Sequence, residues 1–96
     1  MASGFKGAPG ALTTEVGKII KGELAYRGED QKDLAEATGI SASMLSAMLN
    51  GQKHITLSDL DKICFALRES VLELLKKAEA KTSGRHAEGD WGAARL

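Results

Sequence analysis

One side of the segment 42–50 is built from small residues, and none of them carries a charge. They are Ala42, Ser43, Ser46 and Ala47, and Asn50 follows one helical turn after Ser46. This spacing places them on one face of a helix, where an ordinary solvent-facing helix carries lysine and glutamate. Hydroxyl and amide groups donate and accept hydrogen bonds, whereas a hydroxyl needs an adjacent base to act as a nucleophile. The chemistry of this face is therefore reversible recognition.

Residue types that support catalysis or metal binding are present elsewhere, but they are not grouped. No nucleophile stands with a base and an orienting residue, and there is no phosphate-binding loop. His54 and His86 lack ligand-like spacing with each other or with Cys64. Cys64 lies on an apolar stripe, which indicates a small buried residue. We therefore expect no enzyme activity, no cofactor and no metal site.

Two short helices joined by a tight turn are expected to position the recognition face. The first runs from about Gln31 to Thr38 behind the N-cap Asp30, and the second follows the N-cap Ser41 and stops at Asn50–Gly51. Gly39 lies between them, where a sharp turn needs a positive φ. The second helix turns inward through Leu45, Met48 and Leu49. Its slim, uncharged outer face suits the major groove of DNA, which admits one α-helix.

Three further helices complete the expected fold. One is expected to start at a cap formed by Thr13 or Thr14 and to end near Gly28. A T-x-x-D box from Thr56 and an S-x-x-E box from Ser70 predict where the other two begin. Each of the three carries apolar residues at i, i+3 and i+4 spacing.

Length and composition favour a single all-α domain. The chain has 96 residues, of which 43% are hydrophobic and only 4% aromatic, so the core must be built from aliphatic side chains on packed helices. We expect a flexible arm over residues 1–12, a compact five-helix domain over 13–81 and a disordered tail over 82–96.

Charge and hydropathy limit which binding partners and which cellular compartment we expect. The 13 Lys and Arg balance the 13 Asp and Glu, and residues 28–50 hold one lysine against four carboxylates. Non-specific attraction to phosphates is therefore expected to be weak, with few phosphate contacts. No apolar run approaches the roughly 20 residues that span a bilayer. With no signal peptide and one cysteine, we expect a cytoplasmic protein.

Two stretches of the chain resemble a known family. QKDLAEATGISASMLSAMLNG resembles the helix-turn-helix of the phage lambda repressor, Cro and related Xre-type regulators, and KICFALRESVLELL resembles the family's fourth and fifth helices. The resemblance extends from Val16 to Leu75. It implies a lambda-repressor-like DNA-binding domain in a bacterial host cell. It further implies a transcription regulator that acts as a homodimer on operator DNA, such as a phage or prophage immunity repressor or a Cro-like protein.

The resemblance also implies roles for particular residues. Residues early in the second helix of the motif, and one turn further on, would approach base edges. These are Ala42, Ser43, Ser46 and Ala47. Residues at the rim would touch the DNA backbone, and these are Gln31, Asn50, Lys53 and His54. Because alanine mainly senses a thymine methyl group and serine discriminates poorly, sequence choice would depend partly on DNA shape.

Four positions outside the recognition face carry further expectations. Lys6 would wrap the duplex, as the lysine-bearing arm of the lambda repressor does. Leu72, off the apolar stripe of the last helix, would contact a second subunit. Glu29 and Glu69 depart from the apolar residues usual in the family, which puts local packing in doubt there.

Several of these residues also have an interpretation that involves no function. The two serines can be ordinary surface residues, Lys53 and His54 a solvated loop, and Leu72 a stray surface leucine. A second function of the fold is an antitoxin that neutralises a toxin and regulates its own operon, with residues 82–96 available to bind a protein partner. An adjacent toxin gene would favour the antitoxin, and an adjacent integrase region the phage switch.

Overall fold

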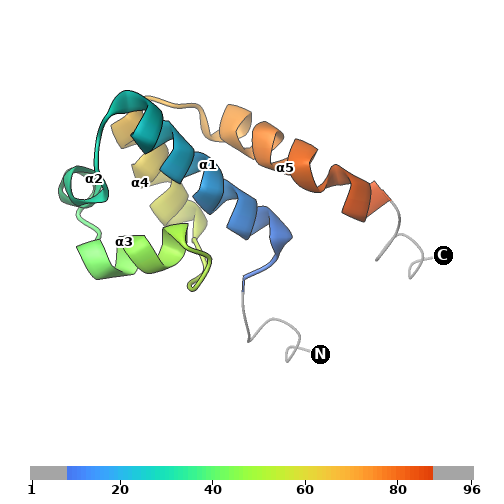
Figure 1. Cartoon of the computed structure of the whole chain (residues 1–96), viewed down its shortest axis with the longest axis horizontal. Coiled ribbons are helices and arrows are strands. Elements are labelled where there is room, and N and C mark those ends of the chain that lie inside the picture. Colours follow the sequence, from blue (N-terminus) through green and yellow to red (C-terminus); the bar gives the residue numbers. More distant parts are fainter. Residues whose placement is uncertain (1–8, 88–96) are drawn as a thin grey trace.

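The computed structural model describes residues 9–87, which form five helices and no strand (Figure 1). The helices are α1 (Ala11–Arg27), α2 (Gln31–Thr38), α3 (Ala42–Leu49), α4 (Leu57–Leu67) and α5 (Val71–Ala87). This confirms the predicted all-α, five-helix architecture with the helix-turn-helix as its second and third helices.

Side-chain caps begin four of the helices, as their sequences predict. Asp30 accepts from the backbone N–H of Asp33 at 3.0 Å, and Ser41 accepts from that of Met44 at 3.1 Å. Thr56 and Ser70 accept in the same way, at 3.0 and 3.2 Å, from the amides three residues on. Each such bond satisfies an amide that has no partner within its helix, and is worth about 1 kcal/mol.

The predicted start of the first helix was wrong. α1 begins at Ala11 behind Gly10, whose extended backbone forms the N-cap without a side-chain bond. Thr14 is already inside the helix, and its hydroxyl donates to the carbonyl of Gly10 at 3.0 Å. The extra turn lets Leu12 pack against the core, so apolar burial outweighs the capping preference of threonine.

The predicted end of the last helix was also too early. α5 continues to Ala87, five residues beyond Thr82, where we expected a disordered tail to begin. Ala78 is fully buried and Thr82 is only 6% exposed, because α5 lies along α1 (Figure 1). The expected arm boundary at residue 12 and tail boundary at residue 82 therefore both fall inside helices. Residues 1–8 and 88–96 lie outside the described part of the chain.

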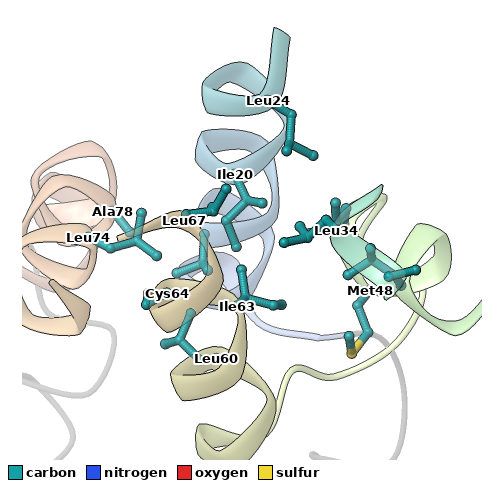
Figure 2. Packing of buried hydrophobic residues seen from close by; sticks show 14 residues of the cluster. Ile20, Leu24, Leu34, Met48, Leu60, Ile63, Cys64, Leu67, Leu74 and Ala78 are labelled. Atoms are coloured by element: carbon teal, nitrogen blue, oxygen red, sulfur yellow. The ribbon is translucent and has the colours of Figure 1, made fainter. Parts of the chain in front are cut away.

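The core is a single aliphatic cluster contributed by all five helices (Figure 2). Its most deeply buried large side chains are Ile20, Leu45, Met48, Leu49, Ile63 and Cys64. Complete burial of an aliphatic side chain of this size contributes about 1.5–3 kcal/mol. The expectation that Cys64 is a small buried residue is confirmed.

Left-handed residues end several helices. Gly28 and Gly39 have φ of 72° and 78°, as their sequence positions predict, and the amide of Gly39 donates to the carbonyl of Ala35 at 2.9 Å. Arg68 ends α4 with φ 59°, the single non-glycine residue of positive φ among residues 9–87. A side chain in this conformation costs about 1–2 kcal/mol.

Candidate nucleic-acid interface

Helix α3 packs on one side and is open on the other. Leu45, Met48 and Leu49 are at most 1% exposed and pack toward α1 and α2. On the opposite side Ala42 and Ser43 are exposed, while Ser46 and Ala47 are half-buried. The helix lies at an edge of the molecule (Figure 1). The uncharged face predicted from the sequence is therefore presented outward, most openly at its first turn.

A lysine that the sequence analysis missed joins this face. Nζ of Lys21, on α1, donates to Oδ1 of Asn50 at 2.7 Å, although the two residues are 29 positions apart. Asn50 in turn donates from Nδ2 to the hydroxyl of Ser46 at 3.3 Å. The three residues form a chain of hydrogen bonds, named here the Lys21–Asn50–Ser46 chain. It brings a cation to the end of the recognition helix.

The pattern of α1 held a signal for this lysine. Lys21 is four residues after Gly17, so the two share a face of α1. Gly17 is the residue of α1 that meets the backbone of Leu49. A helix-interior glycine indicates close approach of another backbone, and its i+4 neighbour lies beside that approach.

The start of α2 lies close to the same lysine. Gln31 is half-buried and lines one surface hollow together with Lys21 and Asp30. The Asp30 carboxylate and nearby Glu29 disfavour an approaching phosphate, whereas the Lys21 ammonium attracts one. Lys21 therefore lies next to two of the residues expected to touch the DNA backbone, Gln31 and Asn50.

The remaining expected site residues are more dispersed. Lys53 and His54 are exposed in the loop between α3 and α4. Leu72 is 62% exposed on α5, a helix that packs mainly on α1 and α4. Lys6 lies outside the described residues. The structure thus gathers Ser46, Asn50 and Lys21, and leaves Leu72 on another part of the surface.

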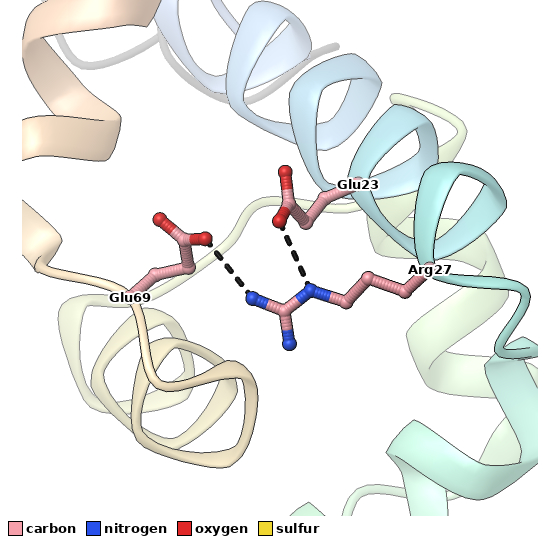
Figure 3. A network of polar contacts seen from close by, with 3 residues as sticks. All are labelled: Glu23, Arg27 and Glu69. Carbon is pink, nitrogen blue, oxygen red and sulfur yellow. Dashed lines mark hydrogen bonds and ion pairs between the residues drawn. The ribbon is translucent and has the colours of Figure 1, made fainter.

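A second polar cluster explains the unusual glutamate at position 69. Nε of Arg27 lies 3.0 Å from Glu23 and Nη2 lies 3.1 Å from Glu69 (Figure 3). The hydrogen bond that Arg27 donates to Glu23, with the nearby carboxylates, raises the pKa of Arg27 above its usual value. Glu69, which departs from the family's apolar residue, thus joins the end of α1 to the turn between α4 and α5. This cluster has a structural role.

Metal-binding clusters and membrane-spanning helices are both absent from the described part of the chain. Residues 9–87 contain no cluster of three His, Cys, Asp or Glu side chains arranged to hold a metal ion. None of the helices formed by these residues has the length and apolarity needed to cross a membrane.

The fold and the exposed third helix define a helix-turn-helix DNA-binding protein. Comparison with family models gives a match over residues 20–77 to the Cro/C1-type HTH DNA-binding domain. The chain therefore belongs to the Cro/C1-type family, as the resemblance in its sequence predicts.

Solved structures support the same assignment. Two structures of the clp gene regulator ClgR from Corynebacterium glutamicum are each 30% identical to this chain. One superposes with a TM-score of 0.71 over 88% of this chain and 87% of that one. The other has a TM-score of 0.68 over 73% and 91%. No curated protein sequence matches. Family and similarity together support transcription regulation through DNA binding.

Proposed function

We propose that this protein regulates transcription by binding operator DNA as a homodimer, with α3 in the major groove. The observation that supports this most directly is the open, uncharged face of α3 beside the Lys21–Asn50–Ser46 chain. A face of small side chains lets the helix backbone lie close to the base edges, where serine can donate or accept a hydrogen bond and alanine can contact a thymine methyl group.

The contacts proposed for this complex fall into two classes. Ala42 and Ser43 in the first turn of α3, and Ser46 and Ala47 one turn on, read base edges. Gln31, Asn50, Lys53 and His54 contact the backbone and fix register without reading sequence. Lys21 adds a cation to the second class, and Lys6 adds a contact from the arm.

The proposed mode of regulation is repression by occlusion. A dimer on a promoter covers the surface that RNA polymerase needs, as an immunity repressor or Cro-like protein of a phage or prophage does. Because the net charge of the chain is zero, non-specific binding along the genome is weak, and occupancy depends on base and shape readout. The similarity to a clp gene regulator supports a role in gene regulation, but it does not indicate which promoter this protein binds.

The experiment that tests this proposal is a binding titration on the DNA upstream of the protein's own gene. A scrambled duplex of equal length serves as competitor, at two salt concentrations. We expect selective binding with a shallow salt dependence. Ser43→Ala with Ser46→Ala should relax selectivity by about 1 kcal/mol for each discriminating hydrogen bond that is lost.

Ser58→Ala is the matched control, because Ser58 is an exposed serine near the start of α4. It should leave selectivity unchanged. Equal binding to the upstream and scrambled duplexes, unaffected by the paired serine change, would contradict the proposal.

A further inference from the structure

Lys21 is hydrogen-bonded to Asn50, which is expected to contact the DNA backbone, and Asn50 is hydrogen-bonded to Ser46, which is expected to contact the bases. We infer that Lys21 is a positioning residue for base choice: it orients Asn50, which makes the Ser46 hydroxyl a hydrogen-bond donor toward the bases. This rests on the proposed function, in which α3 reads the major groove. Beyond the proposed function, the inference states that the Ser46 hydroxyl donates its hydrogen bond, and that it therefore selects bases that present an acceptor atom.

The orientation of the Asn50 amide follows from the chemistry of its neighbour. An ammonium group has three donors and no acceptor, so only the amide oxygen can face Nζ of Lys21. The 2.7 Å separation is that of a strong, charge-assisted hydrogen bond. With the oxygen held by Lys21, the amide nitrogen is turned toward Ser46.

The orientation of the Ser46 hydroxyl follows in turn. A hydroxyl has one proton and two acceptor positions, and Nδ2 of Asn50 occupies one acceptor position. The proton of Ser46 is then turned from Asn50 and is available to an approaching base edge. Guanine O6 and N7, adenine N7 and thymine O4 accept in the major groove, whereas the exposed group of cytosine is an N4 donor. Ser46 therefore disfavours cytosine at the strand position it faces.

Ser43 provides an internal comparison. Its side chain is exposed on the same face of α3, but it does not take part in the Lys21–Asn50–Ser46 chain. A hydroxyl that is free to rotate can donate or accept, so it accommodates any base. Of the two serines, Ser46 is the one that discriminates.

The chain of bonds also leaves donors for the phosphates. Lys21 uses one of three N–H groups on Asn50, and Asn50 uses one of two on Ser46. The spare donors can bind a phosphate without breaking the chain. Loss of Lys21 should therefore have two separable effects, a uniform loss of affinity and a relaxed preference at one base position.

The test is selection of binding sites from random-sequence duplexes by the full chain, read by sequencing. Wild type and Ser46→Ala together locate the position that Ser46 reads, where wild type should disfavour cytosine by about threefold to tenfold, the discrimination of one hydrogen bond. Lys21→Met and Asn50→Ala should relax the same position to about one- to twofold. Lys21→Arg, which keeps a donor for Oδ1, should restore the preference. Lys53→Met, the matched control, should lower affinity at all sites equally.

The outcomes separate the two proposals. If wild type enriches no sequence, the proposed function itself fails. If wild type enriches a site and Ser46→Ala changes no position of it, the inference is wrong. It is also wrong if Lys21→Met keeps the wild-type preference and loses only affinity and salt dependence, because Lys21 is then a phosphate contact alone. A wild-type preference for cytosine at the position that Ser46 reads would likewise overturn it.

Discussion

Gly17 of α1 lies directly against the backbone carbonyl of Leu49 at the end of α3. A Cβ atom added to Gly17 would be 2.7 Å from that oxygen, closer than Cβ atoms approach in proteins. The contact lets α1 and α3 cross at backbone distance, just before Asn50. It therefore fixes how far the end of the recognition helix stands from the body of the domain.

The Gly17 contact predicts opposite effects for two glycine-to-alanine changes in the same helix. Gly17→Ala should gain up to about 1 kcal/mol of helix propensity but lose about 1–3 kcal/mol by overpacking against Leu49, for a net destabilisation. Gly22 has no atom within 4 Å of an added Cβ, so Gly22→Ala should stabilise by up to about 1 kcal/mol. Urea denaturation measures both. Equal stabilisation by the two changes would show that α3 moves away freely.

Self-association is predicted to depend on Leu72. Its side chain is 62% exposed at the start of α5, and a carboxylate there would be desolvated in a dimer interface. Leu72→Glu should raise the dimer dissociation constant by about tenfold or more. Analytical ultracentrifugation without DNA measures this constant.

Ala37→Glu is the control for Leu72→Glu. It adds the same charge at an exposed position of α2, a helix that packs on α3 and α4. It should leave the dissociation constant unchanged. An unaltered constant in Leu72→Glu, or an equal change in both variants, would place the interface elsewhere.

The Arg27 cluster should contribute more to stability than an isolated surface pair does. The side chains of Arg27, Glu23 and Glu69 are 24–28% exposed, and the arginine contacts both carboxylates. The pair of Lys76 and Glu73 is about 60% exposed and 3.8 Å apart. Arg27→Met should therefore lower the thermal midpoint more than Lys76→Met, and 1 M NaCl should narrow the gap by screening. Identical midpoints in low salt would mean that the cluster contributes nothing.

The buried thiol predicts a loss of stability in alkali. Burial raises the pKa of Cys64 above its usual value of 9.0, and the charges of Glu69 and Asp61 add to the rise. The folded state thus holds this proton more tightly than the unfolded state does. The resulting stability is present below the unfolded pKa and disappears as pH rises through the folded one.

Cys64→Ala provides the comparison. This variant should be about 1 kcal/mol less stable than wild type at pH 7, because a buried sulfur is lost. The difference should shrink at pH 10. Urea midpoints at the two pH values measure the effect, and a constant difference would contradict it, because the two proteins differ only at residue 64.

Local signals predicted most of the fold correctly. Asp30, Ser41, Thr56 and Ser70 each cap the helix that follows them, because capping depends on residues three positions apart. The start of α1 was missed because the burial of Leu12 is tertiary. The length of α5 was missed for the same reason, since Ala78 and Thr82 are buried where α5 lies along α1, although the sequence from Thr82 on is polar and contains glycine.

The site was only partly predictable for a related reason. The face of α3 follows from helical spacing alone. The contact of Lys21 with Asn50 joins residues 29 positions apart, and that of Arg27 with Glu69 joins residues 42 apart. Such pairs depend on how α1 crosses the other helices. Gly17 indicates that another backbone approaches α1 near Lys21, but residue types along the chain do not reveal which residue lies there. Glu69 departs from the apolar residue usual in the family, and its ion pair with Arg27 explains it only when the structure is known.

The course of α5 has a practical consequence for anchoring the protein. This helix leads away from α2 and α3, and its C-terminal end lies on the far side of the molecule from them (Figure 1). A dye or an immobilisation handle attached to the C-terminal end of α5 is therefore held on the side remote from the recognition face. Surface-based kinetic assays can hold the protein at that end of α5 and leave α3 accessible to a duplex in solution.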